Sequence, residues 1–173
     1  MEKQVLVVYG TKYGATAEIA ERIGQVLREA GLRADVQPAD RVGGLEPYGA
    51  VVLGSAVYIG QWRKEAANFL KANETVLAEK PVWLFSSGPT GEGNAVELAQ
   101  GWRFPGKLQP IADRIQARDV VIFHGAADER KMGRLDKWLL KNVKAPIGDY
   151  RDWEAIESWA AAIAEELKAG TAE

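Results

Sequence analysis

The sequence contains no cysteine and a single histidine, His124, among its 173 residues. The lack of cysteine excludes a disulfide, a thiolate metal site and a cysteine nucleophile. No apolar run approaches the ~20 residues that a membrane-spanning helix needs. The chain enters an apolar strand almost at once, as a protein without a signal peptide does. We therefore expect a cytoplasmic protein with no bound metal.

An excess of charge of one sign is also absent, because 22 Lys and Arg and 24 Asp and Glu leave a net charge of −2. This balance gives no case for nucleic-acid binding, which requires a strongly basic surface. The hydrophobic share of 47% and the charged share of 27% are ordinary for a soluble globular protein. The sequence shows no repeat and no linker, so residues 1–173 are expected to form a single domain.

Apolar runs and helical periodicities alternate along the chain. Consecutive or alternating apolar side chains predict strands at 5–9, 33–37, 50–54, 82–85 and 120–123. Apolar residues at helical spacing predict helices at 15–30, from 63, at 95–100, 108–115, 132–143 and 156–167. Asp152 is the expected N-cap of the last helix. This alternation predicts an α/β three-layer sandwich, with a doubly wound parallel sheet and helices on both faces. The second strand alternates as an edge strand does, so the expected strand order is 2-1-3-4-5.

In a doubly wound sheet the ligand lies at the carboxyl ends of the strands, where the winding direction reverses. The loops after the first, third and fourth strands should therefore surround one site. In the first loop, Gly10 and Gly14 let the backbone close around an anion. Thr11 and Thr16 offer hydroxyl donors there, and the following helix presents free N–H groups. These residues predict a phosphate cradle, although a threonine-capped strand–helix turn would contain them too.

The other two loops suit a flat aromatic ligand attached to that phosphate. Tyr58 and Trp62 offer aromatic faces near Gly60. The small residues from Ser86 to Gly91 offer backbone N–H groups to a polar ring edge. Aromatic side chains that merely cover a helix start, and an ordinary glycine-rich turn, are the alternatives for these two loops.

The expected cofactor-binding residues come from all three loops. They are Thr11, Lys12, Tyr13, Gly14, Ala15 and Thr16 in the first, Ser55, Ala56, Val57, Tyr58, Ile59, Gly60 and Trp62 in the second, and Ser86, Ser87, Gly88, Pro89, Thr90 and Gly91 in the third. No side chain is expected to be catalytic, because the cofactor would carry the chemistry.

The segment from Thr11 to Thr16 resembles the FMN-phosphate loop of flavodoxins. It matches at both threonines, Tyr13 and Gly14, and it differs at Ala15, where flavodoxins often carry asparagine. The resemblance extends from Val5 to about Leu167 of the chain. It implies a flavodoxin-like fold and FMN as a non-covalently bound cofactor.

Among flavodoxin-like proteins, the chain is similar to the menaquinone-dependent protoporphyrinogen dehydrogenases and their relatives. The shared features are Gly54-Ser55-Ala56 with Tyr58 and Gly60, His124-Gly125-Ala126, Arg134-x-Asp136-Lys137 and Asp152-Trp153-Glu154. Two features depart from that family. The loop after the fourth strand is rich in glycine and proline rather than basic, and Ile59 stands where the family tends to place an aromatic residue.

The resemblance implies a redox protein that transfers electrons through its flavin. The partner would be a dedicated redox protein, or the chain would act directly as an oxidoreductase on a quinone or a porphyrinogen. A flavin-free binding module on the same fold is a third alternative. Glu92 is the acid expected nearest the ring, with Lys12 and Arg63 close by. We therefore expect a less negative redox potential than that of a strongly acidic flavodoxin. His124 either satisfies local hydrogen bonds or assists proton transfer.

Residues 128–144 carry six cations and three acids, a local charge of +3. Together with Leu135, Trp138 and Leu139 they predict a basic amphipathic helix. This helix is a candidate for contact with an anionic membrane surface, where quinones reside, or with an acidic partner. A helix that packs on the core with a solvated basic face would show the same pattern.

Overall fold

The computed structural model describes residues 4–171. Its main sheet has five parallel strands in the order β2-β1-β3-β5-β6. Their bounds are Gln4–Gly10 for β1, Arg33–Pro38 for β2, Tyr48–Tyr58 for β3, Val82–Ser87 for β5 and Asp119–Phe123 for β6. These are the first to fifth parallel strands along the chain, so the predicted order 2-1-3-4-5 is confirmed, as is the three-layer α/β class.

β1 lies inside the sheet, between β2 and β3, and its sequence explains why. The four apolar residues from Val5 to Val8 are fully buried, which requires that both faces of the strand are covered. Successive side chains of a strand point to opposite faces. Leu6 and Val8 therefore enter one hydrophobic core, and Val5 and Val7 enter the other.

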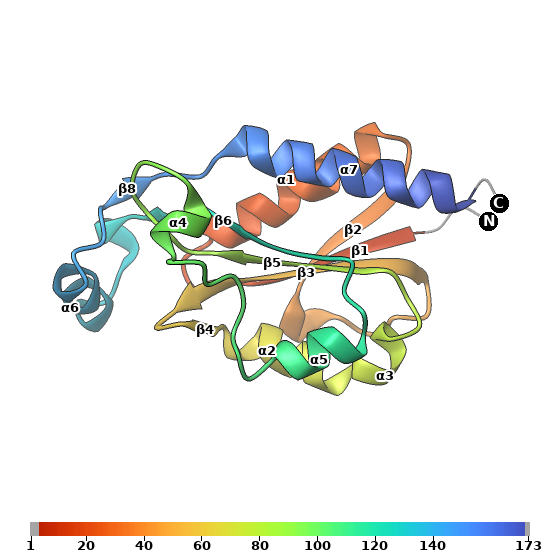
Figure 1. Cartoon of the computed structure of the whole chain (residues 1–173), viewed down its shortest axis with the longest axis horizontal. Helices are drawn as coiled ribbons and strands as arrows, with labels where there is room; N and C mark the ends of the chain where they lie inside the picture. Colours follow the sequence, from red (N-terminus) through yellow and green to blue (C-terminus); the bar gives the residue numbers. More distant parts are fainter. Residues whose placement is uncertain (1–3, 172–173) are drawn as a thin grey trace.

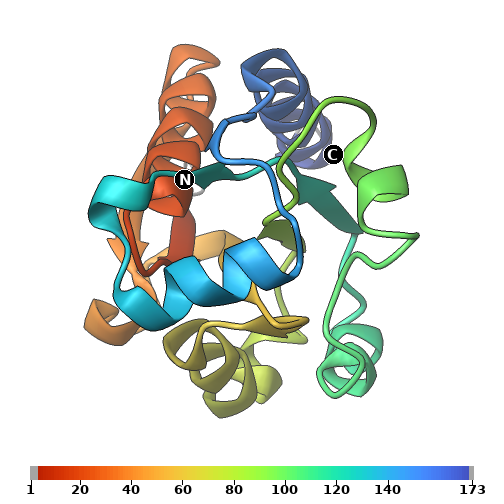
Figure 2. The same ribbon diagram turned by 90° about the vertical axis from the view of Figure 1, so that its left-hand side faces the viewer.

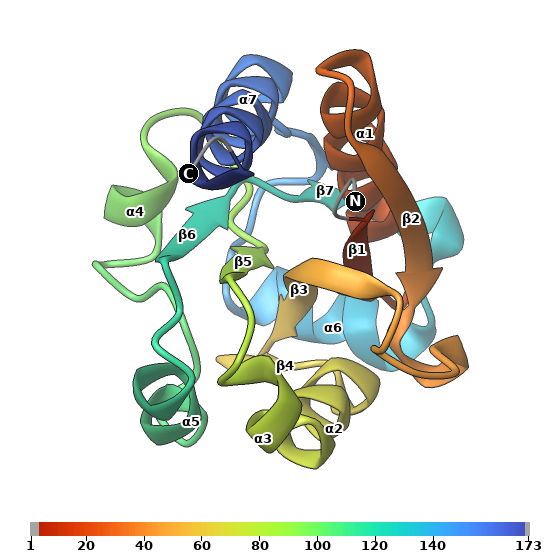
Figure 3. The ribbon, with the colours of Figure 1, turned by 90° about the vertical axis from the view of Figure 1, so that its right-hand side faces the viewer.

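Helices cover both faces of the sheet (Figures 1 and 3). α1 (Ala15–Glu29) and α7 (Trp153–Thr171) lie side by side on the face of Val5. The opposite face is covered by α2 (Lys64–Ala72), α3 (Glu74–Leu77) and α5 (Gln109–Arg114). The predicted cap of the last helix is confirmed, because Ala155 N donates to the Asp152 carboxylate at 3.1 Å.

Three short elements connect these layers: η1 (Ala39–Arg41), β4 (Gln61–Trp62) and α4 (Ala95–Leu98). β4 folds back antiparallel on β3 through a hairpin loop of two residues. A strand of two residues is too short to show a periodicity, so the sequence did not predict it. The short helix predicted at 95–100 is present as α4.

Between β6 and α7 the chain leaves the three layers. It forms β7 (Ala126–Ala127), η2 (Glu129–Lys131), α6 (Arg134–Asn142) and β8 (Gly148–Asp149), and β7 pairs antiparallel with β8. Seen from the carboxyl ends of the parallel strands, α6 crosses in front of the sheet (Figure 2). None of the nine residues of α6 is buried, so the interpretation of this segment as a core-packing helix is wrong. No helix within residues 4–171 is long and apolar enough to cross a membrane.

Candidate functional site

The first loop turns sharply between β1 and α1. Gly14, the N-cap of α1, has a φ of 95°, a left-handed conformation that glycine adopts without steric cost. Its N–H donates to the hydroxyl oxygen of Thr11 at 3.0 Å. No side chain in the described part of the protein caps α1. The N–H groups of its first turn and the positive end of its dipole are therefore open to an anion.

The structural role of Gly10 differs from the one expected from the sequence. A Cβ at this position would lie 2.9 Å from the Cβ of Ala66 and 3.0 Å from the Cβ of Arg63. The glycine therefore permits the close approach of β1 to the start of α2. Packing, rather than closure around an anion, explains the lack of a side chain at position 10.

Buried hydrogen bonds support the second and third loops from beneath. Trp62 Nε1 donates to Ser86 Oγ at 2.9 Å, and that hydroxyl donates to the carbonyl oxygen of Arg103 at 2.8 Å. Ser55 Oγ accepts from the backbone N–H of Arg63 at 2.8 Å. Trp62 is only 6% exposed, because the pairing of β4 with β3 turns it into the core. Its expected role as an exposed stacking face is therefore corrected to that of a support.

Tyr13 and Tyr58 bring the first and second loops together. Their ring centroids are 6.4 Å apart in an edge-to-face arrangement. Burial first, and then the nearby Tyr13 and Asp136, raise the pKa of Tyr58 to about 12. The Nζ of Lys12 lies 5.7 Å and the guanidinium carbon of Arg63 lies 5.8 Å from the Tyr58 ring centroid. The two rings thus form an aromatic wall bordered by two cations.

The hairpin loop between β3 and β4 has two consecutive left-handed residues, Ile59 with a φ of 51° and Gly60 with a φ of 67°. Two-residue hairpins with positive φ at both positions normally contain Asn-Gly or Asp-Gly. Ile59 is 81% exposed, and a β-branched residue is strained in this conformation. Such strain is found preferentially at functional sites. Here the hairpin loop places the apolar side chain of Ile59 at the rim of the second loop.

The third loop is fixed by backbone bonds to the end of β6, and one of its hydroxyls is left without a partner. Gly88 N donates to the carbonyl oxygen of Phe123 at 3.2 Å, and Gly125 N donates to that of Pro89 at 2.8 Å. The Thr90 hydroxyl oxygen is buried and has no hydrogen-bond partner among residues 4–171. Because buried polar groups are nearly always paired, we expect a bound ligand or water to complete this one.

The three loops meet at one edge of the sheet, as the topology predicts. In the strand register Gly10 lies opposite Ser55, and Ser55 lies opposite Ser86. A Cβ at Gly88 would lie 3.2 Å from the Cβ of Val57, so the third loop rests against the second. With the tyrosine contact between the first two loops, the three form one continuous region.

Exposure divides the predicted site residues into three groups. The buried ones are Thr16, Ser55, Ala56, Trp62, Ser86, Ser87 and Gly91. The exposed ones are Lys12, Ile59 and Gly60. The remaining ones, of intermediate exposure, are Thr11, Tyr13, Gly14, Ala15, Val57, Tyr58, Gly88, Pro89 and Thr90. The partly exposed residues are those that a ligand could contact without displacing the core.

α6 places an acidic side chain on the first loop, which sequence reasoning missed. The Asp136 carboxylate accepts hydrogen bonds from Lys12 Nζ and from the Tyr13 hydroxyl. These bonds, the one from Lys12 first, lower the pKa of Asp136. Glu92, the acid expected nearest the site, is exposed to solvent instead. Asp136 lies 124 residues from Lys12 along the chain, so only the shared motif around Asp136 gave any sign of it.

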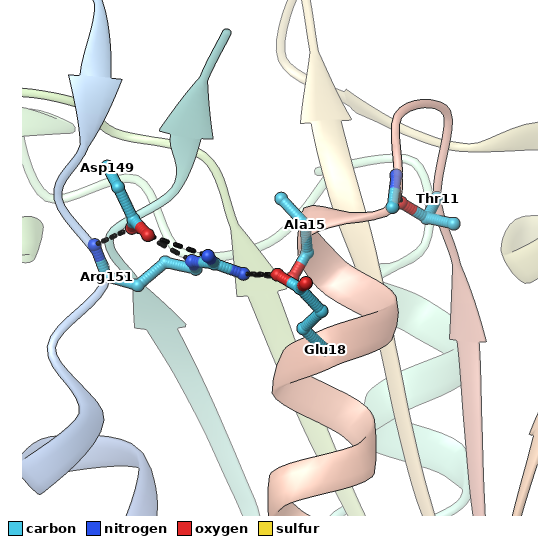
Figure 4. A network of polar contacts seen from close by, with 6 residues as sticks. Thr11, Ala15, Glu18, Asp149 and Arg151 are labelled. Atoms are coloured by element: carbon cyan, nitrogen blue, oxygen red, sulfur yellow. Dashed lines mark hydrogen bonds and ion pairs between the residues drawn. The ribbon is translucent and has the colours of Figure 1, made fainter. Parts of the chain in front are cut away.

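Arg151 is a second residue that the sequence did not reveal. Its guanidinium pairs with the carboxylates of Asp149 and Glu18, and it donates to the carbonyl oxygen of Ala15 at 3.1 Å (Figure 4). The two carboxylates raise the pKa of Arg151 above its usual value. This network ties the segment before α7 to the first turn of α1. The network borders a cavity of about 340 Å³, which is lined by Tyr13, Ala15, Glu18 and residues of the segment 126–151.

The flavodoxin domain family matches residues 6–153. The protoporphyrinogen IX dehydrogenase (quinone) of Escherichia coli K12 is 25% identical over 172 residues, which cover 93% of this chain and 94% of that protein. The resemblances expected from the sequence are therefore confirmed at the level of the family.

Two solved structures show the same fold. A flavodoxin from the domain Archaea gives a TM-score of 0.62 at 15% identity, and the match covers 95% of this chain and 99% of the other. The rubredoxin oxygen:oxidoreductase of Desulfovibrio gigas gives a TM-score of 0.66 at 15% identity. That match covers 99% of this chain and only 38% of the larger protein.

Proposed function

This chain belongs to the flavodoxin domain family, whose members are FMN-binding redox proteins, and we propose that its three loops hold FMN without a covalent bond. The observation that carries this assignment of the site is the uncapped start of α1 at Gly14, beside two loops that contain an aromatic wall and an unpaired hydroxyl. When bound, the flavin supplies one- or two-electron chemistry. The chain supplies binding, orientation and exclusion of water, and no side chain is assigned a catalytic role.

The first loop would hold the phosphate. A phosphate monoester carries between one and two negative charges near neutral pH, which the N-terminus of a fifteen-residue helix favours. The Thr11 hydroxyl already accepts a bond from Gly14, so its own proton is free to be donated. Lys12 adds a positive charge that it shares with the Asp136 carboxylate. Since position 15 is alanine, backbone N–H groups and the Thr11 hydroxyl are the principal contacts. The hydroxyl of Thr16, a residue that is only 2% exposed, would meet the phosphate from the base of the loop.

The second and third loops would hold the flat ring. Tyr58 offers a partly buried aromatic surface, and Trp62 supports this region from beneath through its bond to Ser86. The unpaired Thr90 hydroxyl is suited to the polar edge of the ring, whose oxygen and nitrogen atoms need hydrogen-bond partners. Gly88 and Gly91 let the third loop pack closely on its neighbours, because a Cβ at these positions would lie 3.2 Å from the Cβ of Val57 and 3.3 Å from the Cγ of Pro146.

A comparison of two ligands tests the assignment of the first loop. FMN and riboflavin share the ring, and only FMN carries the phosphate. We expect the apoprotein to bind FMN more tightly, and Thr11→Ala and Thr16→Ala to lose much of this preference while riboflavin affinity changes little. Thr75→Ala, at an exposed position of α3, is the matched control. Equal affinity of the unmodified protein for both ligands would show that the loop does not grip the phosphate.

The electron acceptor or donor is proposed to be a quinone or a redox partner protein. The E. coli relative is named for the use of a quinone, and the small net charge of −2 does not provide a strongly acidic docking surface. A porphyrinogen is a second candidate substrate, favoured by the same relative. Turnover with a quinone and a reductant, without any partner protein, would support a direct oxidoreductase. Reduction of the flavin without such turnover would support a carrier that works with a partner.

A further inference from the structure

Large apolar side chains that are exposed to solvent are concentrated in one stretch of the chain. Of the seven large hydrophobic residues that are exposed in residues 4–171, four lie between positions 135 and 147. They are Leu135 at 68%, Trp138 at 60%, Val143 at 71% and Ile147 at 49% exposure. Single exposed apolar side chains are ordinary, but a cluster of them marks a contact surface.

The exposed charges of α6 are all positive. Arg134, Lys137 and Lys141 lie open to solvent. The single acid of the helix, Asp136, turns the other way and pairs with Lys12 and Tyr13, so that only 14% of its side chain is exposed. The bonds of Asp136 to the first loop thus remove the negative charge from the outward surface of α6.

Cations and apolar groups alternate on this outward surface, which we call the outer face of α6: Arg134, Leu135, Lys137, Trp138 and Lys141. Trp138 follows Arg134 by four residues and precedes Lys141 by three, so both cations are its neighbours on the helix surface. Lysine and arginine can bury their aliphatic stems and keep their charge in water. Tryptophan is favoured at an interface between an apolar phase and water, because its ring is apolar and its N–H group can donate a hydrogen bond.

We propose that the outer face of α6 docks the protein onto the surface of an anionic lipid bilayer. A helix that lies in the plane of the interface needs apolar side chains beside a basic face, and clusters of Lys and Arg are attracted to anionic lipids. α6 crosses the edge of the sheet where the three loops end (Figure 2). Docking through α6 would therefore bring the candidate cofactor site next to the bilayer. The benefit, access to a quinone dissolved in the lipid, rests on the proposed function.

Charge favours a lipid surface over a second copy of this chain. Two outer faces of α6 related by a two-fold axis would place cations against cations, since a symmetric interface uses the same patch twice. An acidic protein surface could pair with the cations. A purely acidic surface would leave the exposed side chains of Trp138 and Leu135 without an apolar contact, unless that surface also offered an apolar groove.

Vesicle binding by the full chain loaded with FMN tests the proposal. Vesicles of phosphatidylcholine alone are compared with vesicles that also contain phosphatidylglycerol, and bound protein is measured by sedimentation. We expect binding only to the anionic vesicles. The double variant Lys137→Glu with Lys141→Glu should lower the affinity by about a hundredfold. The control pair, Lys71→Glu with Lys107→Glu, makes the same change of net charge at exposed sites outside α6 and should lower it several-fold at most.

A second readout follows Trp138 itself. Lipids brominated along their acyl chains quench the fluorescence of tryptophans that enter the bilayer. We expect quenching in the unmodified protein and its loss in Trp138→Phe. Equal sedimentation of both double variants, or quenching that survives Trp138→Phe, would overturn the proposal. Self-association through α6, or binding of an acidic protein without any binding to vesicles, would do the same.

The membrane-docking proposal and the proposed cofactor site can be refuted independently of each other. Thr11→Ala with Thr16→Ala should weaken FMN binding and leave vesicle binding unchanged. The double variant Lys137→Glu with Lys141→Glu should bind FMN as the unmodified protein does. Normal FMN binding without vesicle binding would refute the docking alone, and vesicle binding without FMN binding would refute the proposed function alone.

Discussion

Asp136 connects α6 to the first loop through Lys12 and Tyr13, and this connection depends on its charge. The pKa of Asp136 is lowered in the folded protein. The bonds therefore stabilise the structure fully at pH values above the pKa of this group in the unfolded chain, which is about 4. Their contribution is lost as the pH falls through the lower, folded pKa. We expect α6 to detach in acid, with faster amide hydrogen exchange over residues 134–142 after correction for intrinsic rates.

In the variant Asp136→Asn, the amide hydrogens of α6 should exchange fast even at neutral pH, and their exchange should show no further acceleration in acid. Asp128→Asn is the control, because Asp128 pairs with Arg130 within its own turn and is not bonded to the first loop. Protection of α6 that is the same in Asp136→Asn and in the unmodified protein would show that other contacts hold the helix.

Thr90 gives a second prediction for a single residue. Its buried hydroxyl has no partner within the described chain, and an unsatisfied buried group costs about 1–3 kcal/mol. Thr90→Val removes the hydroxyl and keeps the shape. We expect the apoprotein to gain about 1 kcal/mol in denaturant unfolding and the affinity for FMN to fall about tenfold.

Thr75→Val, at an exposed position of α3, is the matched control for this change. If Thr90→Val destabilises the apoprotein and leaves FMN binding unchanged, the hydroxyl serves the fold and not the ligand.

The sequence revealed those site residues that lie next to one another along the chain. Thr11 to Thr16 form one loop, so their order alone suggested a phosphate cradle. Asp136 and Arg151 reach the same loop from the segment between β6 and α7. No local periodicity encodes such a contact, so the structure was needed to find it. Trp62 was misinterpreted for a related reason, since the β4 hairpin decides which way it points.

At the scale of the elements, Gly54 shows how closely β3 and β5 fit. A Cβ on Gly54 would lie 2.1 Å from the ring of Phe85, which is fully buried. The ring cannot withdraw from a close-packed core without strain. We expect Gly54→Ala to lower the free energy of unfolding by about 3 kcal/mol, measured by denaturant unfolding of the apoprotein.

Gly106→Ala is the control for this variant, because a Cβ at Gly106 would meet no atom of the described chain within 4 Å. It should change the stability by less than about 0.5 kcal/mol. A Gly54→Ala protein as stable as the control would show that the Phe85 ring can move aside at little cost.

The long elements could be predicted because their patterns extend over several turns or residues. The apolar run of β1 specified a strand covered on both faces, and the periodicity of α1 specified an amphipathic helix. The position of α6 could not be predicted in the same way. An amphipathic pattern identifies a helix, but it does not say whether the apolar side meets the core, another part of the chain or a separate partner.

At the scale of the whole molecule, the charge distribution bears on the redox potential. A negative charge near a flavin disfavours its anionic reduced form. Beside Tyr58 the cations Lys12 and Arg63 offset the carboxylates of Asp136 and Glu65 with which they pair, and the net charge is only −2. We expect a midpoint potential less negative than that of a strongly acidic flavodoxin, measured by redox titration. Lys12→Gln should make it more negative, and Lys71→Gln, on the outer side of α2, should not. A very low potential in the unmodified protein would contradict this electrostatic picture.

The central claim is that the loop after β1 grips the phosphate of FMN. Phosphorus NMR of the FMN-loaded protein tests it most directly, because the signal reports the environment and the ionisation of that group. Free phosphate monoesters lose their second proton near pH 6. We predict a single bound resonance whose position stays constant through that pH range, because the N-terminus of α1 holds the dianion. A resonance that titrates as free FMN does, or FMN that does not bind at all, would contradict the account.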